Sequence, residues 1–405
     1  MAANAPRILV VGTGPVGLIA ALSLSRAGFA VDLAGPDVRM DDRRTTALMV
    51  PALNHLRQLG VLDAIEAGAA PLAVMRIVDA TGRLIRSPVV TFRASEIGER
   101  HFGLNIPNRH LNKVLADAAF TDPNIARRKS VVESWRLEAD RAVALFSGGV
   151  EIGTPLAVAA DGRLSPARDA AGIRTVTHDY PQAALVLNFA HTRPHGSVST
   201  EFHTETGPFT QVPLPGDRSS LVWVVRPQTA EELAGLDDAA LSRRVEDRMQ
   251  SMLGRVTVEP GRQIYPLSAK VPLSFGRNRV ALLGEAAHVF PPIGAQGLNL
   301  GIRDVVDLVD SIRQNPADPG EARVLAAYDR KRRPDILART GAVDLLNRSL
   351  LSDLLPAQFA RTAGLGLLGA FGPLRAFFMR EGMRPGSGVS ATFDGLREQV
   401  GRKRA

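Results

Sequence analysis

The stretch Gly12-Thr13-Gly14-Pro15-Val16-Gly17 decides how the N-terminal part of this chain folds. It is a G-x-G-x-x-G pattern that follows an apolar run from Arg7 to Val11 and opens a helical pattern ending near Ala27. A second apolar run, Phe29 to Ala34, completes a strand–turn–helix–strand unit. In such a unit the first glycine allows the turn, the second lets a pyrophosphate approach the backbone, and the third lets helix and strand pack closely. The stretch therefore predicts a dinucleotide-binding turn, with Pro15 in the first helical turn.

The ribose contact is the least regular part of this unit. An acidic residue at the end of the second strand usually holds the adenosine ribose, but this chain has Gly35 there. Asp37 lies two residues further on and is the candidate replacement. A glycine-rich turn that binds no ligand is the alternative interpretation, so the assignment depends on the other motifs of the chain.

A second stretch, Gly284-Glu285-Ala286-Ala287-His288, follows an apolar strand from Arg279 to Leu283. It continues through Pro291-Pro292 into glycines that open another helical pattern. Such a helix start favours electron-rich ligand atoms, because its first N–H groups lack partners and the helix dipole points the right way. His288 either orders this loop or passes protons, or it is a structural histidine bonded to the backbone.

Polar residues also follow the second strand and two further predicted strands. Asp161-Gly162 comes after the apolar run Leu156 to Ala160, where an ordinary Asp-Gly turn is the simplest interpretation. The segment Asp42-Arg43-Arg44-Thr45-Thr46 places cations and hydroxyls just after the second strand. The strand-like segment Phe102 to Ile106 leads into a helix start that carries Arg109.

Together and in this order, these motifs resemble those of the single-component FAD-dependent aromatic hydroxylases, and within them the ubiquinone-biosynthesis hydroxylases. The likeness covers about residues 5 to 385. It is carried by Gly12-x-Gly14-x-x-Gly17, Asp161-Gly162, and Gly284-Glu285 leading to Pro291-Pro292 and Gly294-x-x-Gly297-x-Asn299. There are two departures from the family pattern: Gly35 replaces an acidic residue, and Glu285 replaces the usual Asp and so carries its carboxylate on a longer arm.

The resemblance implies an α/β fold: a Rossmann-like FAD-binding domain with an inserted antiparallel β-sheet substrate domain and a helical C-terminal region. Strand and turn patterns divide the chain accordingly. We assign residues 1–75, 98–175 and 268–340 to the FAD-binding domain, residues 76–97 and 176–267 to the β-rich substrate domain, and residues 341–405 to the helical C-terminal region.

The resemblance also implies the cofactor and the chemistry. NADPH or NADH, as a transient electron donor, reduces non-covalently bound FAD, and O₂ then supplies one oxygen atom to an electron-rich phenolic ring. Pro292 and Gly294 would shape the site where oxygen reacts, beside His288. No residue is identified as the phenol-activating base. The implied cofactor contacts are Gly12, Gly14, Pro15, Gly17, Asp37, Arg44, Arg109, Asp161, Gly162, Glu285, Gly297, Leu298 and Asn299.

Composition limits the alternatives. The chain has 405 residues and no cysteine, which excludes disulfides, thiolate nucleophiles and cysteine-based metal sites. The eight histidines form no metal-binding pattern, so no metal is predicted. No uninterrupted apolar run is long enough to cross a bilayer, and we expect a cytoplasmic enzyme.

The net charge of +8 is concentrated near the C-terminus. From Glu321 onward there are fifteen Lys and Arg residues against eight Asp and Glu residues. Two basic clusters, Arg330-Lys331-Arg332-Arg333 and Arg402-Lys403-Arg404, flank a segment rich in Leu and Phe. This pattern predicts either contact with an anionic membrane surface, at the inner face of the cytoplasmic membrane, or a tail helix that packs on the core. Nucleic acid is not expected as a partner, because the aromatic residues form no stacking platform.

The substrate expected from the resemblance and the tail is a lipophilic phenol or quinone precursor of ubiquinone biosynthesis, and a biosynthetic complex is an expected partner. Two other functions stay open. One is hydroxylation of a soluble aromatic acid, whose carboxylate an arginine such as Arg226 would bind. The other is an FAD-binding protein without oxygenase activity.

Overall fold

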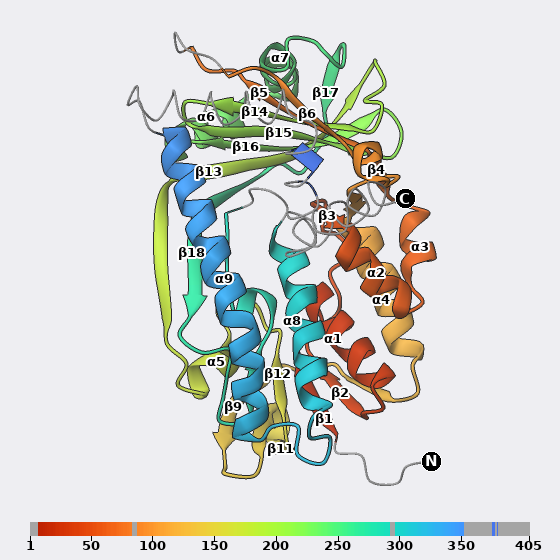
Figure 1. The fold of residues 1–405 in the computed structure, drawn as a ribbon, viewed down its shortest axis with the longest axis vertical. Coiled ribbons are helices and arrows are strands. Elements are labelled where there is room, and N and C mark those ends of the chain that lie inside the picture. Colours follow the sequence, from red (N-terminus) through yellow and green to blue (C-terminus); the bar gives the residue numbers. More distant parts are fainter. Residues whose placement is uncertain (1–6, 83–86, 292–295, 352–374, 377–378, 380–405) are drawn as a thin grey trace, which may run out of the picture.

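A six-stranded sheet forms the centre of the cofactor domain in the computed structural model, which describes residues 7–82, 87–291, 296–351, 375, 376 and 379 (Figure 1). Its strands are parallel except for the short edge strand β19. This is the arrangement that the glycine-rich turn predicted. In sheet order the strands are β19 (Gly276–Arg277), β20 (Val280–Leu282), β12 (Ala157–Ala159), β1 (Ile8–Val11), β2 (Val31–Ala34) and β8 (Ile125–Arg128).

The two faces of this sheet are covered differently, because successive side chains of a strand point to opposite faces. Ile8 and Val10 of β1 pack into the main core with the helices. Leu9 and Val11 pack instead against a small three-stranded sheet of β9 (Val132–Leu137), β10 (Ala142–Phe146) and β11 (Val150–Thr154). The helices and 3₁₀ turns of the domain are α1 (Pro15–Arg26), α2 (Val50–Gln58), α3 (Leu62–Glu66), α4 (Asn108–Thr121), α5 (Pro166–Ala170), α8 (Gln296–Ile312), η1 (Ala94–Ile97), η2 (Ser147–Gly149) and η3 (Gly284–Ala286).

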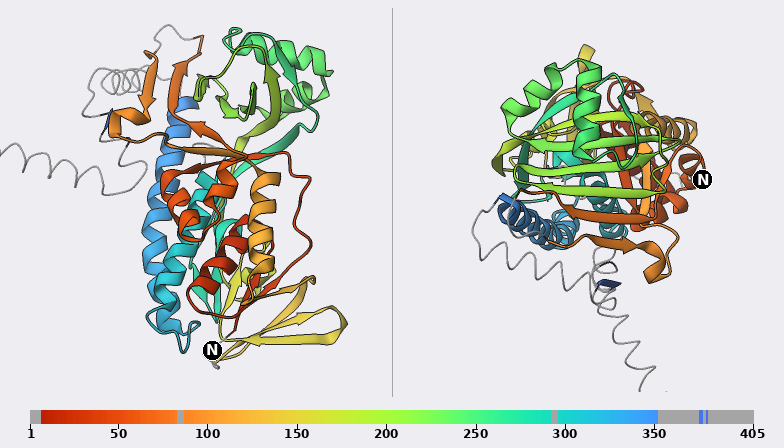
Figure 2. Two further views of the ribbon diagram at one scale, coloured as in Figure 1. Left: turned by 90° about the vertical axis from the view of Figure 1, so that its right-hand side faces the viewer. Right: turned by 90° about the horizontal axis from the view of Figure 1, so that it is seen from above.

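A second, eight-stranded sheet lies above the cofactor domain (Figures 1 and 2). One face packs its aromatic residues Phe202, Phe209 and Trp223 into a separate core with α6 (Pro227–Gly235) and α7 (Asp238–Arg248). The other face is turned toward the cofactor domain. In order the strands are β17 (Val256–Val258), β13 (Thr175–His191), β16 (Arg218–Val225), β15 (Gly207–Leu214), β14 (Val198–Thr204), β5 (Val74–Asp79) and β6 (Val90–Arg93), with β18 (Gln263–Pro272) also paired to β13.

The two parts are connected by continuous strands. Strand β18 pairs along its length with the first part of β13, Thr175 to Val186, and the register shifts between Asp179 and Ala183. The boundary predicted between residues 267 and 268 therefore falls inside β18. A small sheet of β3 (Thr45–Met49), β7 (Gly103–Pro107) and β4 (Ala70–Leu72) lies between the two parts. The predicted fold class is confirmed: an α/β cofactor domain carries an inserted, largely antiparallel sheet.

Helix α9 (Ala322–Leu351) corrects part of the predicted basic surface. Arg332 belongs to the first basic cluster, yet its side chain is only 1% exposed and forms ion pairs with three aspartates. Arg333 bonds to Asp329 and to the carbonyl of Leu273. Arg332 and Arg333, two of the four cations of this cluster, are therefore paired within the protein. The second basic cluster and most of residues 341–405 lie outside the described residues, although Met379 packs beside Ala94 and Phe102.

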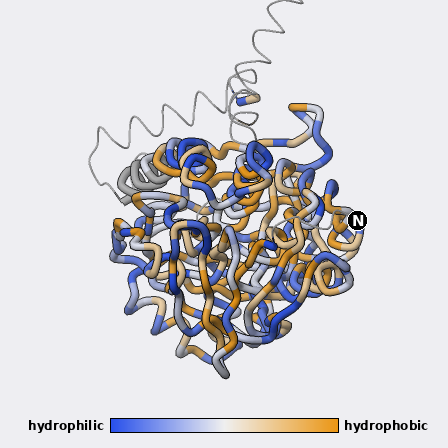
Figure 3. The backbone as a smooth tube through the Cα atoms, turned by 90° about the horizontal axis from the view of Figure 1, so that it is seen from below, coloured by the Kyte–Doolittle hydropathy of each residue, from blue (hydrophilic) through white to orange (hydrophobic). Residues whose placement is uncertain are grey.

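Hydropathy follows this architecture. Figure 3 shows hydrophobic segments running mainly through the middle of the molecule and hydrophilic segments mainly at its periphery. Among the residues that the structure describes, none of the helices is both long enough and apolar enough to span a membrane.

Candidate active site

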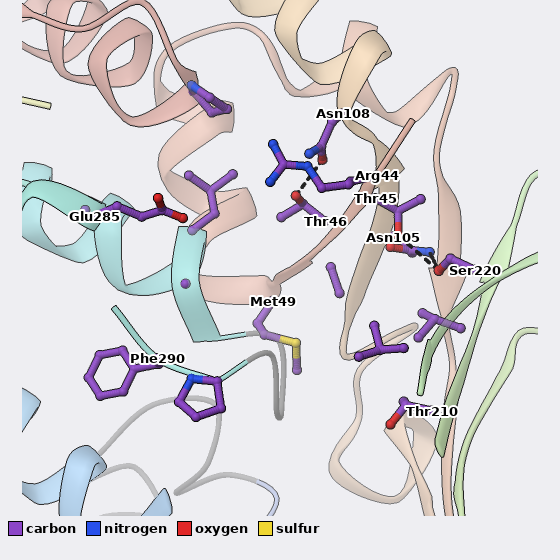
Figure 4. Close-up of a pocket in the computed structure, with 18 of the residues that line it drawn as sticks. Arg44, Thr45, Thr46, Met49, Asn105, Asn108, Thr210, Ser220, Glu285 and Phe290 are labelled. Carbon is purple, nitrogen blue, oxygen red and sulfur yellow. Dashed lines mark hydrogen bonds between the residues drawn. The ribbon is translucent and has the colours of Figure 1, made fainter. Parts of the chain in front are cut away.

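A cavity of about 680 Å³ lies between the cofactor domain and the inner face of the large sheet (Figure 4). A polar seam beside it joins the two parts: the Asn105 amide donates to the carbonyl of Pro213 at 2.8 Å, and the Thr45 hydroxyl donates to Ser220 at 3.0 Å. On the cofactor side the lining residues are Gly14, Pro15, Val16, Ala160, Gly162, Arg163, Leu283, Gly284, Glu285, Gly297 and Leu298.

Different physical reasons explain why each of the three positions in the first motif is a glycine. A Cβ atom on Gly12, whose φ is +117°, would lie 2.1 Å from the carbonyl oxygen of Ala160. A Cβ atom on Gly17 would lie 1.9 Å from the carbonyl oxygen of Gly12. Packing therefore requires both. A Cβ atom on Gly14 would meet no described atom within 4 Å, and Gly14 lines the cavity. The open space at Gly14 fits the approach of a pyrophosphate to the backbone.

Asp161 supplies a second sign that a ligand belongs here. Its Oδ2 accepts a hydrogen bond from the backbone N–H of Ala167 at 3.3 Å, while its buried Oδ1 has no partner among the described residues. Burial raises the pKa of this carboxyl. A buried acceptor without a partner is costly. Its neighbours Ala160 and Gly162 line the cavity, so a hydroxyl-bearing cofactor beside this turn fits the site.

The start of helix α8 faces the same cavity. The helix begins at Gln296, and its next residues, Gly297 and Leu298, line the cavity together with Glu285. The Asn299 side chain points elsewhere, and its amide joins the backbone N–H of Met49 and the carbonyl of Ala47, at 2.9 and 2.8 Å. These two bonds fix the helix start against strand β3. Pro292 and Gly294 lie outside the described residues.

A buried charge network supports the Gly284–His288 turn. The Asp304 carboxylate accepts from His288 Nε2 at 2.7 Å, from the Gly284 backbone N–H at 2.9 Å and from Arg332 Nε at 2.7 Å. Burial disfavours the charged carboxylate, but the charges of His288 and Arg332 outweigh it and hold the pKa of Asp304 below its usual range. His288 itself lines the cavity. It thus orders the loop, and its Nδ1 has no partner among the described residues.

Arg44 lines the cavity while held by a carboxylate. It donates two hydrogen bonds to Asp42, at 2.8 and 2.6 Å, and the Asn108 amide donates a third at 3.0 Å. Burial opposes ionisation of Asp42, yet these hydrogen bonds lower its pKa to about 2. Asn108 also accepts from the Thr46 hydroxyl at 2.6 Å, as Figure 4 shows. The ion pair with Asp42 thus holds the Arg44 guanidinium in a fixed position at the cavity.

Two predicted contacts lie elsewhere. The Asp37 carboxylate is 70% exposed and pairs with Arg127 and, at 3.2 Å, with Lys129. Arg109 lines a separate cavity of about 270 Å³ with Arg218 and Glu259. Its neighbour Asn108 takes the place at the main cavity that we expected for Arg109, because successive helical residues point in directions about 100° apart.

Sequence reasoning predicted a β-rich substrate domain but named none of the residues on the face of the large sheet that lines the cavity, here called the substrate wall. Residues in register on four neighbouring strands line it: Ile77 of β5, Glu201 of β14, Thr210 of β15 and Val222 of β16. Strict alternation in β14 could have indicated this face, because Phe202 between Glu201 and His203 points into the opposite core. Strands β14, β15 and β16 follow one another in sequence, but β5 comes from a distant part of the chain, so the complete face could not be assembled from sequence.

The fold and this cavity define a dinucleotide-binding oxidoreductase with an added substrate sheet. Comparison with known proteins supports that class. Residues 6–340 match the FAD binding domain family, and the chain belongs to this family. FAD is its cofactor, and the predicted resemblance to FAD-dependent hydroxylases is confirmed.

Relatives of known activity cover nearly the whole chain. The ubiquinone hydroxylase UbiL of Rhodospirillum rubrum is 32% identical over 386 residues, which is 93% of this chain and 89% of the relative. The 3-demethoxyubiquinol 3-hydroxylase of Escherichia coli is 29% identical over 378 residues, covering 88% and 93% of the two chains. The structure of p-nitrophenol 4-monooxygenase PnpA from Pseudomonas putida shares the fold, with a TM-score of 0.75, 23% identity and coverage of 93% and 96%.

Proposed function

We propose that this FAD-dependent monooxygenase hydroxylates the phenolic ring of a polyprenylated precursor of ubiquinone, with NAD(P)H as electron donor and O₂ as oxygen source. The observation that carries the proposal is the composition of the cavity away from the cofactor motifs. A mainly apolar wall suits a hydrophobic ligand. It includes Met49, Leu72, Met75, Ile77, Phe92, Val212, Val222, Val289 and Phe290.

The residues have distinct roles in this reaction. When bound, FAD supplies the electron transfer and oxygen activation that protein side chains cannot supply. The chain binds and orients it through the glycine turn and the start of helix α8. The apolar wall keeps water away from the reacting centre and holds the ring. The Asp304 network holds the turn at His288 in one position.

A soluble aromatic acid is the second candidate, and one observation favours it. Arg76 of β5 lines the cavity and is a cation that could pair with a carboxylate. The arginine expected for that role, Arg226, is exposed at the start of α6 and does not line the cavity. Arg44 is already held by Asp42. The acid candidate therefore rests on Arg76, whereas the mainly apolar wall supports the lipophilic phenol.

Turnover assays distinguish the candidates. The purified protein should be yellow with non-covalent FAD, and with a prenylated phenol it should form one hydroxylated product for each NAD(P)H consumed. A soluble hydroxybenzoate should give little product. Product from the acid alone would support the second candidate, and FAD-dependent NAD(P)H oxidation without hydroxylated product from either would support a flavoprotein that is not an oxygenase. Mass spectrometry of quinone intermediates in a deletion strain identifies the ring position.

We also propose that the enzyme works at the inner face of the cytoplasmic membrane, where such a substrate resides, as part of a biosynthetic complex. The support is the basic, apolar sequence from residue 341 onward, in which Arg402-Lys403-Arg404 forms the terminal cluster. A cation near an anionic bilayer contributes about 1 kcal/mol. The packing of Met379 on Phe102 shows that part of this segment belongs to the core, so the terminal cluster is the better target for a test.

Vesicle binding tests the membrane proposal. Neutralising Arg402, Lys403 and Arg404 to glutamine should weaken binding to anionic vesicles by about 100-fold at low salt, because about three such contributions are lost. Wild-type binding should also fall as ionic strength rises. The matched control replaces three exposed arginines of the sheet domain, Arg243, Arg244 and Arg255. Equal binding by wild type and the first variant, measured by co-sedimentation, would contradict the proposal.

A further inference from the structure

We propose that Glu201 is the catalytic residue that accepts the proton of the substrate hydroxyl, and that His203 is a positioning residue for it. This inference rests on the proposed phenol hydroxylation and assigns the activating group that the sequence alone did not identify. It starts from the placement of Glu201 in the sheet that forms the substrate wall.

Glu201 occupies a central position on that wall. It lies on β14 with Ile77 as its neighbour on β5 and Thr210 as its neighbour on β15. The adjacent row on the same face contains Met75, Ser199, Val212 and Ser220. Both rows line the cavity. A carboxylate is thus set among mostly apolar and hydroxyl side chains, where an interaction with a substrate hydroxyl is stronger than in water.

Two contacts fix the orientation of this carboxylate. His203 Nε2 lies 2.8 Å from its Oε1, and the Thr210 hydroxyl donates to Oε2 at 3.3 Å. The side chain of His203 is 9% exposed, whereas that of Glu201 is 23% exposed. On the neighbouring strand β5, the cation Arg76 also lines the cavity. Glu201 is held by its neighbours and keeps acceptor capacity, because each carboxylate oxygen can accept more than one hydrogen bond.

The other ionisable groups of the cavity are placed for different roles. Among the described lining residues the carboxylates are Glu201 and Glu285. Glu285 lies on the cofactor side, within the turn Gly284–Ala286. His288 follows the same turn on the cofactor side, where its Nε2 is held in the Asp304 network. Arg44, Arg76 and Arg163 carry no acceptor. Glu201 is therefore the carboxylate on the substrate wall that can take a proton.

The reaction requires a proton acceptor at the step in which the ring is oxygenated. As the ring carbon forms its new bond to oxygen, the phenol O–H bond breaks and its electron pair becomes the π bond of a ring ketone. The proton moves to Glu201. The ring carbon then loses its hydrogen as a proton to water, the ring becomes aromatic again, and Glu201 returns its proton to the ring oxygen. NAD(P)H supplies the two electrons and O₂ supplies the oxygen: the O–O bond breaks, one oxygen atom enters the ring, and the other leaves as water. General-base catalysis of this kind contributes about 10²–10⁴-fold.

Substrate acidity provides the first test. In the FAD-loaded enzyme, Glu201→Gln should retain FAD and NAD(P)H oxidation, release hydrogen peroxide, and lose at least about 100-fold in hydroxylation of a prenylated phenol. With a more acidic, ring-fluorinated analogue the loss should be under about tenfold, because the analogue gives up its proton more readily. Glu205→Gln is the matched control, since Glu205 is an exposed carboxylate of the same hairpin that does not line the cavity. An equal loss with both substrates would overturn the assignment.

The positioning role of His203 is tested separately, through kcat and KM. If it positions Glu201, His203→Leu should lower kcat while KM stays within about twofold, and His203→Gln, which keeps an N–H donor, should restore most of kcat. A rise in KM alone, or no rescue by glutamine, contradicts the positioning role.

Ionisation of a bound nitrophenol with an alkyl chain provides a test that needs no turnover. A neighbouring carboxylate disfavours the phenolate, so the wild type should raise the pKa of the bound probe, measured by its absorbance, and Glu201→Gln should lower it again. If the wild type shows this effect but hydroxylates no phenol, the proposed function fails while the Glu201 contact stands. If Glu201→Gln leaves the probe pKa unchanged, the Glu201 assignment fails even when the wild type is a hydroxylase. A probe that does not bind at all also contradicts it.

Discussion

Replacing Gly14 with valine is expected to weaken FAD binding by about 100-fold or more while the protein stays folded. Hydrogen bonds to charged groups contribute about 1.5–3 kcal/mol each, and displacing a pyrophosphate from the backbone loses at least one or two of them. The fold should survive because a Cβ atom at Gly14 meets no described atom within 4 Å. FAD titration by fluorescence measures the affinity, and circular dichroism checks the fold.

Two matched glycines separate cofactor loss from misfolding. Gly17→Val should unfold the cofactor domain, because its Cβ atom would lie 1.9 Å from the carbonyl oxygen of Gly12. Gly235→Val should change neither FAD affinity nor fold, since the space around this exposed glycine at the end of α6 is also open. If Gly14→Val binds FAD as tightly as Gly235→Val does, the turn has been assigned to the wrong ligand.

Removing the Asp304 carboxylate is expected to cost about 3–5 kcal/mol of the free energy of unfolding. Breaking a buried ion pair leaves its partners uncompensated, and Asp304 and Arg332 are 0% and 1% exposed. Asp304→Ala should also lower FAD loading, because the Gly284 turn loses its support. Asp310→Ala is the control. This half-exposed aspartate has ion-pair distances of 3.8 and 3.9 Å, so its loss should cost less than about 1 kcal/mol.

The pH dependence of this difference identifies its cause. The folded-state pKa of Asp304 lies below its ordinary value. Its contribution is therefore fully present above the unfolded pKa of about 3.9 and is lost as pH falls through the folded value. The stability gap between wild type and Asp304→Asn, measured by urea unfolding, should stay constant from neutral pH down to about pH 5 and shrink below about pH 4. A gap that does not shrink would indicate lost packing instead of lost charge.

Local motifs were predictable because their physics is local. The turn at Gly12 to Gly17 needs only a strand before it and a helix after it, and both appear where the sequence predicted them. The parallel sheet followed from that unit. The start of helix α8 was likewise readable from Gly297 and the residues around it.

The positions and contacts of individual side chains were less predictable, because they depend on residues that are distant in sequence. Arg332 looked like part of a surface cluster, yet Asp304, twenty-eight positions earlier in the chain, draws it into the interior. Arg109 and Asn108 are adjacent in sequence and face different cavities. Strand β15 follows β14 directly, but the role of Glu201 also depends on strand β5, residues 74–79, lying on its other side, and no local pattern contains that information.

The long ribbon of β13 and β18 has a mechanical consequence. Two hydrogen-bonded strands resist bending where their register is continuous and yield where it is interrupted, which here is between Asp179 and Ala183. The ribbon connects the sheet domain to the cofactor domain and is expected to bend little outside this interruption. Relative movement of the sheet domain and the cofactor domain is therefore expected to be concentrated at residues 179–183, while the paired strands on either side of them move as rigid units.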